Sequence, residues 1–266
     1  MRRPAVAGVF YPARADELNT QVNALVTTVP TKVTAKAIVV PHAGWMYSGR
    51  VAGDVYGRVN LPRLAIILAP NHTGRGAEGA IVSQGQWHLP GGDVRIAQDL
   101  ADIIVAAGQV LEEDEEAHRS EHAIEVQLPF LRWLRPDFAF VPIVLGRSDL
   151  GFCEEVGCAV AVALRIVAEP VLVICSTDLN HYEAQAVSNE KDHLAIDAML
   201  SGDAARLQGV VSERRISMCG LAPAMATLTA LREIGGAEGT LVRYATSGDV
   251  SGDHTRVVGY AGLIFQ

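Results

Sequence analysis

Several apolar segments of this chain are continuous, with no polar residues alternating through them. Residues 37–40, 64–69 and 171–176 are rich in Val, Ile, Leu and Ala, and Pro, Asn or Gly residues bound them. Continuous apolar runs of this length are typical of strands buried on both faces, as in a parallel sheet. Residues 138–145 form a similar run. The pattern therefore predicts at least four buried strands.

The segments between these runs have the longer apolar period of helices. We predict helices at residues 15–26, 51–59, 96–107 and 152–167, one at 121–134 capped by Ser120, and two or three within 189–234. Short hairpin strands are expected at residues 80–83 and 87–89, and an antiparallel pair at 239–245 and 256–264. Strands that alternate with helices predict an α/β fold with a mixed, mostly parallel sheet flanked by helices.

The organisation and composition of the chain narrow its class. No repeat and no linker rich in Gly, Ser or Pro divides residues 1–266, so we expect a single domain. The formal net charge of −8 argues against a nucleic-acid partner, although a local basic pocket could still hold a small anion. No apolar stretch reaches the roughly 18–20 residues that span a membrane. The four cysteines form no CxxC pair, so we expect reduced thiols and a cytoplasmic location.

Histidines follow three of the predicted strands. His42 comes after the first, His72 after the second and His181 after the run that ends at residue 176. In open α/β sheets ligands bind beyond the carboxyl ends of the strands, so these imidazoles could meet there. Imidazole is both a common metal ligand and a common general base, and Asp178 adds a carboxylate beside His181. The alternative is that they are loop histidines hydrogen-bonded to the backbone.

Two further segments of the sequence contain candidate site residues. Cys219 comes just before a predicted helix start, where the helix dipole favours a thiolate suited to metal ligation; the alternative is a half-buried structural cysteine. His122 and Glu125 are three residues apart on the predicted helix, so they would share a face that could point into the site. Equally, His122 could simply cover the helix start.

With these residues assembled, the chain resembles the Memo family. The matching segments, in family order, are Ala-Gly-Val-Phe-Tyr-Pro at residues 7–12, Pro-His-Ala-Gly-Trp-Met-Tyr-Ser-Gly at 41–49, Pro-Asn-His at 70–72, Glu-His-Ala-Ile-Glu-Val-Gln-Leu-Pro at 121–129, Ser-Thr-Asp-Leu-Asn-His-Tyr at 176–182 and Cys-Gly at 219–220. Together they span most of the chain, and the pairing of Pro-His-Ala-Gly-aromatic with His-Ala-Ile-Glu is highly specific.

The resemblance implies a fold similar to the class III extradiol dioxygenases, which bind iron through two histidines and a carboxylate. By motif, His42 and His72 match the histidine ligands, and Cys219 falls at the place of the carboxylate. His181 and Asp178 match other pocket residues, and His122 matches the inner face of the pocket. A thiolate in place of a carboxylate makes a site softer, which favours copper or zinc over the iron of the dioxygenases. Prokaryotic relatives also imply a radical-SAM protein as a pathway partner.

Three functions are compatible with these residues. The first is a metal-dependent redox enzyme with copper or iron held by His42, His72 and Cys219, and with His181, Asp178 and His122 handling protons. The second is a binding module for a peptide or small ligand, in which Trp45 and Tyr47 line the crevice unless they are plain packing residues. The third is a zinc hydrolase, in which His181 or His122 moves the proton.

Overall fold

Four parallel strands form the centre of the molecule in the computed structural model, which describes residues 1–266. They lie in the order β1 (Ala37–Val40), β8 (Val171–Ser176), β2 (Leu64–Pro70) and β7 (Ala139–Leu145). Beside β1 the sheet continues with β11 (Val257–Phe265) and β10 (Gly239–Thr246), both through antiparallel pairing. Beside β7 it continues with β3 (Gly79–Ile81) and β6 (Glu112–Glu113). The predicted mixed, mostly parallel sheet is confirmed.

The central strands are apolar throughout because both of their faces are covered. Along β2, Leu64, Ile66 and Leu68 belong to one buried cluster, and Ala65, Ile67 and Ala69 belong to the other. Successive side chains of a strand point to opposite faces, so a strand between two helical layers must be apolar at every position. This explains the continuous runs in the sequence.

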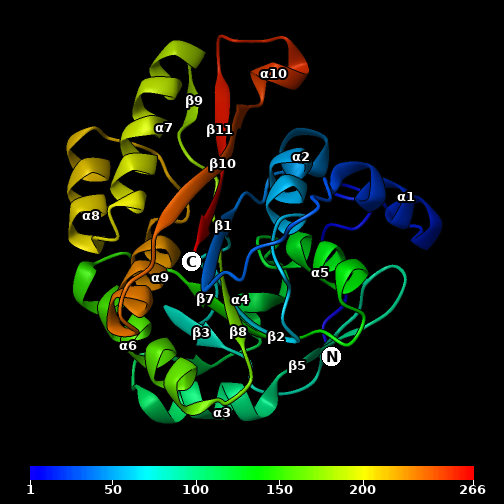
Figure 1. Cartoon of the computed structure of the whole chain (residues 1–266), viewed down its shortest axis with the longest axis vertical. Coiled ribbons are helices and arrows are strands. Elements are labelled where there is room, and N and C mark those ends of the chain that lie inside the picture. The colour runs from blue at the N-terminus through cyan, green and yellow to red at the C-terminus, as the bar shows by residue number, and fades with distance from the viewer.

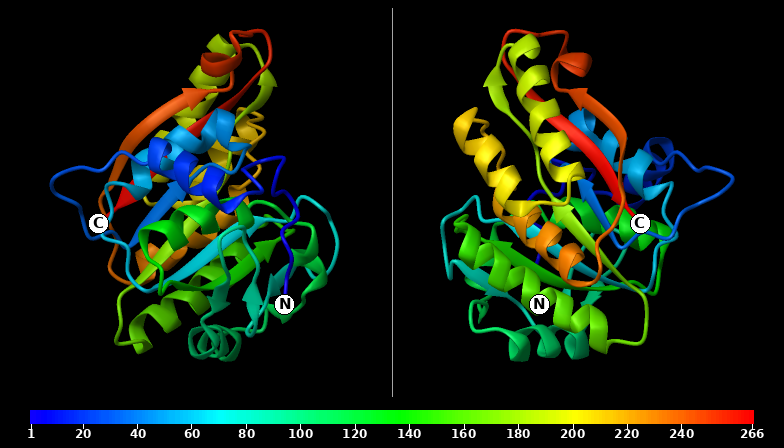
Figure 2. Two further views of the ribbon diagram at one scale, coloured as in Figure 1. Left: turned by 90° about the vertical axis from the view of Figure 1, so that its right-hand side faces the viewer. Right: turned by 60° about the vertical axis from the view of Figure 1, so that its left-hand side comes forward.

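Two helical layers cover the sheet (Figures 1 and 2). One layer contains α3 (Gln98–Ala107), α6 (Leu150–Ile166), α7 (Gln185–Leu200), α8 (Ala204–Glu213) and α9 (Leu221–Glu233). The other contains α1 (Ala15–Leu25), α2 (Trp45–Tyr56) and α5 (Leu128–Leu134). No helix is both long and apolar enough to cross a membrane.

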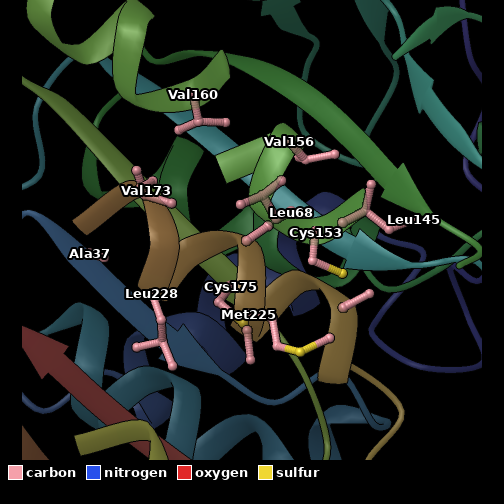
Figure 3. Packing of buried hydrophobic residues seen from close by; sticks show 14 of the residues in the cluster. Ala37, Leu68, Leu145, Cys153, Val156, Val160, Val173, Cys175, Met225 and Leu228 are labelled. Atoms are coloured by element: carbon pink, nitrogen blue, oxygen red, sulfur yellow. The ribbon is translucent and has the colours of Figure 1, made fainter. Parts of the chain in front are cut away.

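Helices α6 and α9 approach each other closely over the sheet. Figure 3 shows Val156 and Val160 of α6 above Cys175 and Val173 of β8, with Leu228 of α9 beside them. A Cβ atom at Gly157 would lie 2.6 Å from the carbonyl oxygen of Ala226 in α9. Glycine is therefore required at this crossing.

Some predicted elements differ from the structure. Helix α2 begins at Trp45, well before the predicted residue 51. Its Gly49 and Gly53 resemble loop residues in the sequence, but a Cβ at Gly53 would lie 2.3 Å from the Leu25 carbonyl oxygen, so close helix packing requires them. The predicted hairpin is also wrong, because β3 pairs with β7, whereas β4 (Gln86–Trp87) pairs with β5 (Val94–Ile96).

The predicted helix over residues 121–134 is wrong in its first half. Helix α4 (Glu116–Arg119) ends at Arg119, and Ser120 is its C-cap and not the N-cap of a following helix. Helical structure resumes only with η1 (Glu125–Gln127) and α5. Two more short elements complete the fold: β9 (His181–Glu183), which pairs with β11, and α10 (Gly248–Ser251). The irregular turn at residues 120–124 bears directly on the site.

Candidate metal centre

Three functional side chains follow the carboxyl ends of neighbouring parallel strands. His42 lies two residues beyond β1, His72 two beyond β2, and Asp178 two beyond β8. Because β8 lies between β1 and β2 and runs parallel to both, these residues reach the same edge of the sheet. The turn after α4 brings His122 to the same place.

Three imidazoles gather at this edge. His42, His72 and His122 each offer one ring nitrogen, and these nitrogens all lie within 4.8 Å of one another. The rings of His72 and His122 stack with their centroids 4.7 Å apart, and the His42 ring meets both of them edge-on. His42 is buried, whereas His72 is exposed and His122 half-buried, so the cluster has one side open to solvent.

The carboxylate of Glu121 orients two of these histidines. It is 1 % exposed, and it accepts hydrogen bonds from the backbone N–H and the Nδ1 of His72 at 2.6 and 3.0 Å. It also accepts the backbone N–H groups of His122 and Ala123, and the Nδ1 of His122 lies 3.3 Å from the same oxygen. Both Nδ1 atoms therefore face a carboxylate, which leaves both Nε2 atoms free to bind a ligand.

His42 is oriented in the same sense by a different group. Its Nδ1 lies 3.0 Å from Oγ of Ser176 at the end of β8. The Ser176 hydroxyl donates its own proton to the Ala123 carbonyl, so it acts as an acceptor toward His42. The proton of His42 therefore resides on Nδ1, and its Nε2 carries a lone pair.

The electrostatic environment keeps His42 and His122 neutral. Burial, together with the nearby His72, lowers the pKa of His42 to about 3. Burial, together with His42, lowers the pKa of His122 to about 4. Burial alone would raise the pKa of Glu121, but the hydrogen bonds and charge of His72 and the Ala123 N–H group outweigh it and lower this pKa to about 2. At neutral pH, His42 and His122 thus present neutral nitrogen donors beside an ionised carboxylate.

Cys219 adjoins the cluster through His42. Its Sγ lies 3.2 Å from Nε2 of His42 and accepts the backbone N–H of Asp178. Burial and the negative charge of Asp178 raise the pKa of the thiol, and α9 begins only at Leu221, beyond the N-cap Gly220. The prediction that the helix start favours a thiolate is therefore wrong for the protein without a metal ion.

Asp178 and His181 have separate surroundings. Asp178 accepts the backbone N–H groups of His42 and Ala43, which fixes the turn that carries His42, and burial raises its pKa. His181 is half-buried at the start of β9, and its Nδ1 donates to the Ser217 carbonyl at 2.8 Å. Of the three histidines that follow strands, His181 is the one held by the backbone, and the structure does not place it among the three clustered imidazoles.

The two aromatic residues of the predicted crevice are not equivalent. Trp45 is buried, donates from Nε1 to the Val126 carbonyl, and packs at a tilt of 41° against Phe130 with 4.3 Å between ring centroids. The structure therefore places Trp45 in the core behind the site. Tyr47 is half-buried on the first turn of α2.

His122 and Glu125 do not share a face. Residues 120–124 form an irregular turn, so His122 lies with His42 and His72. Glu125 is instead fully buried beside the amino-terminal segment. Glu125 pairs with Arg2 at 2.7 Å and accepts from the Tyr11 hydroxyl and two backbone N–H groups of the amino-terminal segment. Phe10 of that segment packs on the His122 ring with 4.8 Å between centroids.

Sequence reasoning missed Glu121, Ser176 and Phe10 as parts of the site. All three lie within the segments that carry the family resemblance, and that was the available signal. Their roles depend on the turn geometry and on hydrogen bonds between distant segments, which periodicity does not reveal.

Comparison with known proteins identifies the family of this chain. Residues 2–264 match the family described as Memo-like protein. The chain belongs to the Memo family. A MEMO1 family protein of Methanopyrus kandleri is 39% identical over 100% of this chain and 99% of its own length. MEMO1 family proteins of Pyrobaculum arsenaticum and Aquifex aeolicus are 40% and 38% identical, each over 100% of this chain and 99% of its own length.

A solved structure shares the fold of this Memo-family chain. The crystal structure of an uncharacterized protein from Escherichia coli K12 aligns with a TM-score of 0.57 over 86% of this chain and 98% of that protein. The two sequences are 14% identical, so the likeness concerns the fold alone.

Proposed function

We propose that this protein is metal-dependent and that its metal ion is held by His42, His72 and His122. The observation that supports this most strongly is the arrangement of three imidazoles whose nitrogens lie within 4.8 Å of one another. In each ring Nδ1 faces a protein oxygen, so the three Nε2 atoms remain as donors. Metal-binding histidines commonly use one ring nitrogen for the metal and the other for such an oxygen.

This ligand set differs from the predicted His42, His72 and Cys219. His122 becomes a ligand in place of a base, and Cys219 becomes a neighbouring donor within reach of His42. Imidazole suits iron, copper and zinc, and an adjacent sulfur makes the site softer. We therefore keep copper or iron as the proposed metal and a redox reaction as the proposed chemistry, with electron transfer supplied by the metal ion when it is bound.

The protein's own groups then have distinct tasks. Asp178 holds the turn of His42 through two backbone hydrogen bonds, and Glu121 holds His72 and His122. His181 donates from Nδ1 to Ser217, so its Nε2 can accept a proton from a substrate on the open side of the cluster. The exposed edge of His72 gives a substrate access.

A zinc hydrolase is the second candidate function. Three histidines with an open position are a ligand set of catalytic zinc, which activates bound water. The observation that favours it is the third imidazole, since the predicted thiolate set did not include it.

The deciding experiment is elemental analysis of protein purified anaerobically under reducing conditions, with three variants beside it. We expect near-stoichiometric metal in the wild type and in the control His193→Ala, whose side chain is exposed on α7, and loss of metal in His122→Ala. Cys219→Ser should keep the metal but change the absorption spectrum if the sulfur binds a redox metal. Zinc in every preparation, with oxygen-independent ester hydrolysis, would favour the hydrolase.

Two results would count against the proposal. Full metal content in His122→Ala would remove His122 from the ligand set. Absence of metal from the wild type even after reconstitution would leave a peptide- or ligand-binding module as the better explanation of the crevice.

A further inference from the structure

A cavity of about 540 Å³ lies beside the amino-terminal segment and includes none of the three clustered histidines. Its volume is within the usual range of small-molecule pockets, which is roughly 300–1,000 Å³. Trp87 and His118 form its buried wall, and Arg3, Glu115 and Arg119 form its exposed rim. This cavity is not part of the site described above.

The buried wall contains an imidazole without a partner. His118 is 1 % exposed, and neither of its ring nitrogens makes a hydrogen bond. Nearly all buried polar groups in proteins are hydrogen-bonded, and an exception calls for an explanation such as a missing ligand. Burial and the charge of Arg2 lower the pKa of His118 to about 4, against smaller opposite effects of the Ala80 carbonyl, Asp114 and Glu121. The neutral ring has one donor and one acceptor to offer.

Three arginines and one carboxylate line the cavity, although the whole chain carries −8. Arg2 is neutralised by its buried pair with Glu125. Arg3 forms no ion pair, Arg119 pairs with Glu116 at 2.9 Å on the protein surface, and Glu115 is the one carboxylate in the lining. The rim therefore offers an anion the unpaired guanidinium of Arg3, with Arg119 beside it in its surface pair with Glu116.

The wall is a layered group of aromatic and planar side chains. The Arg2 guanidinium lies 4.0 Å above the Trp87 ring, and the His118 ring meets Trp87 edge-on at 6.0 Å. Val82 and Ile96 add apolar area to the same lining. A ligand with one planar apolar part and one charged end would match this distribution.

We propose that this cavity is a second ligand site, which takes a small organic oxyanion with a flat apolar group, such as an aromatic carboxylate. The flat group stacks on the Arg2 guanidinium, which itself covers the Trp87 ring, and the oxyanion meets Arg3 and Arg119. The site is connected to the metal centre, because Arg2 donates to the carbonyls of His118 and Glu121 at 2.6 and 2.5 Å. An occupant can therefore influence the residue that orients His72 and His122.

The test uses calorimetric titration of the full chain after treatment with a chelator, so that binding to a metal ion cannot contribute. The probes are benzoate, inorganic phosphate and benzyl alcohol. We expect saturable binding of benzoate, weaker binding of phosphate and none of benzyl alcohol. Arg3→Gln and Arg119→Gln should each weaken benzoate binding about three- to tenfold through loss of a charge-assisted hydrogen bond. Arg95→Gln, an exposed arginine that lines a different cavity, is the matched control and should bind benzoate like the wild type.

Three results would overturn the inference. These are no saturable binding of either anion, equal binding of benzyl alcohol, and equal loss of binding in Arg95→Gln. Tighter binding of phosphate than of benzoate would mean that the oxyanion alone is recognised and would remove the flat apolar group from the proposal. Because the protein is metal-depleted, failure here leaves the proposed metal centre unaffected.

Discussion

At the scale of single residues, Glu121 has the greatest influence on the candidate metal centre. It is buried and ionised, and it receives four hydrogen-bond donors from His72, His122 and Ala123. A carboxylate in this position fixes the rings and increases their basicity toward a metal ion. A side chain outside the proposed ligand set thus determines the geometry of two side chains within it.

Glu121→Gln should weaken metal binding about 10- to 100-fold, the usual effect of losing such a supporting group. The amide has one acceptor oxygen where the carboxylate has two, so one backbone N–H of the turn also loses its partner. Metal affinity can be measured by competition with a chromophoric chelator. Glu116→Gln, in the short helix just before the turn, should leave the affinity unchanged. Unaltered affinity in Glu121→Gln would show that the carboxylate does not act on the metal site.

The buried histidines predict a stability that falls in acid. The pKa is lowered from 6.5 to about 3 for His42 and to about 4 for His118. Between about pH 6.5 and pH 4 the unfolded chain binds protons that the folded chain does not, so the free energy of unfolding falls as pH falls. Each such imidazole contributes up to about 1.4 kcal/mol per pH unit. Asp192 opposes this over part of the range, because burial raises its pKa to about 6 and folding then favours its protonated form.

Urea denaturation of the metal-free protein from pH 7.5 to 4.5 measures this dependence. His193 is exposed on α7, so His193→Gln should retain the loss of stability in acid, whereas replacing the buried His118 in His118→Gln should reduce this loss. A free energy of unfolding that is constant over this range would contradict the assignment of neutral buried imidazoles.

At the scale of elements, the sheet positions the proposed metal ligands, and the packing between helices determines how closely they cover the sheet. The crossing of α6 and α9 depends on Gly157, where an added Cβ would lie 2.6 Å from both the Ala226 carbonyl oxygen and Cβ of Thr229. Contacts under 3.0 Å with backbone atoms force the helices apart, and overpacked cores typically lose about 1–3 kcal/mol.

Gly157→Ala should therefore lower the free energy of unfolding by about 1–3 kcal/mol. Gly151 lies in the same helix, and a Cβ there would meet nothing closer than 3.8 Å, so Gly151→Ala should instead stabilise by up to about 1 kcal/mol through helix propensity. Both values come from chemical denaturation followed by circular dichroism. Equal effects of the two substitutions would mean that the crossing tolerates a methyl group.

At the scale of the whole molecule, we expect binding of a metal ion at the proposed centre to be coupled to folding. The three imidazoles come from residues 42, 72 and 122, which meet only when the sheet is complete. A ligand that binds the folded state alone stabilises it, by about 2.7 kcal/mol at a concentration 100 times its dissociation constant. Added metal should therefore raise the melting temperature of the wild type and leave that of His122→Ala unchanged. An equal rise in both proteins would place the metal elsewhere.

The parts of the fold that the sequence predicts are those set by local patterns. Continuous apolar runs mark β1, β2, β7 and β8, and the carboxyl-end rule then brings His42, His72 and Asp178 to one edge. The third imidazole could not be predicted in this way, because the polar turn at residues 120–124 has the spacing of a helix but is held by Glu121 and by the distant Arg2.

The same reason accounts for the other differences. Gly53 of α2 is explained by the backbone at the end of α1, because an added Cβ would meet the Leu25 carbonyl oxygen. The strands β3 and β5 each pair separately with β7, and β5 is therefore the strand that pairs with β4. Cys219 and Trp45 have neighbours far away in sequence, and these neighbours decide whether a side chain faces the site or the core.

The position of β1 in the sheet also restricts the order of events during synthesis. His42 lies two residues beyond this strand. The strand lies between β8 and β11, which emerge from the ribosome long after it. All three imidazoles are translated in the first half of the chain, yet β1 gains both of its neighbours only when residues 257–265 have been made. A nascent chain therefore exposes these histidines without the sheet edge that assembles them. We therefore expect the metal ion to bind only after translation, when β11 has completed the sheet beside β1.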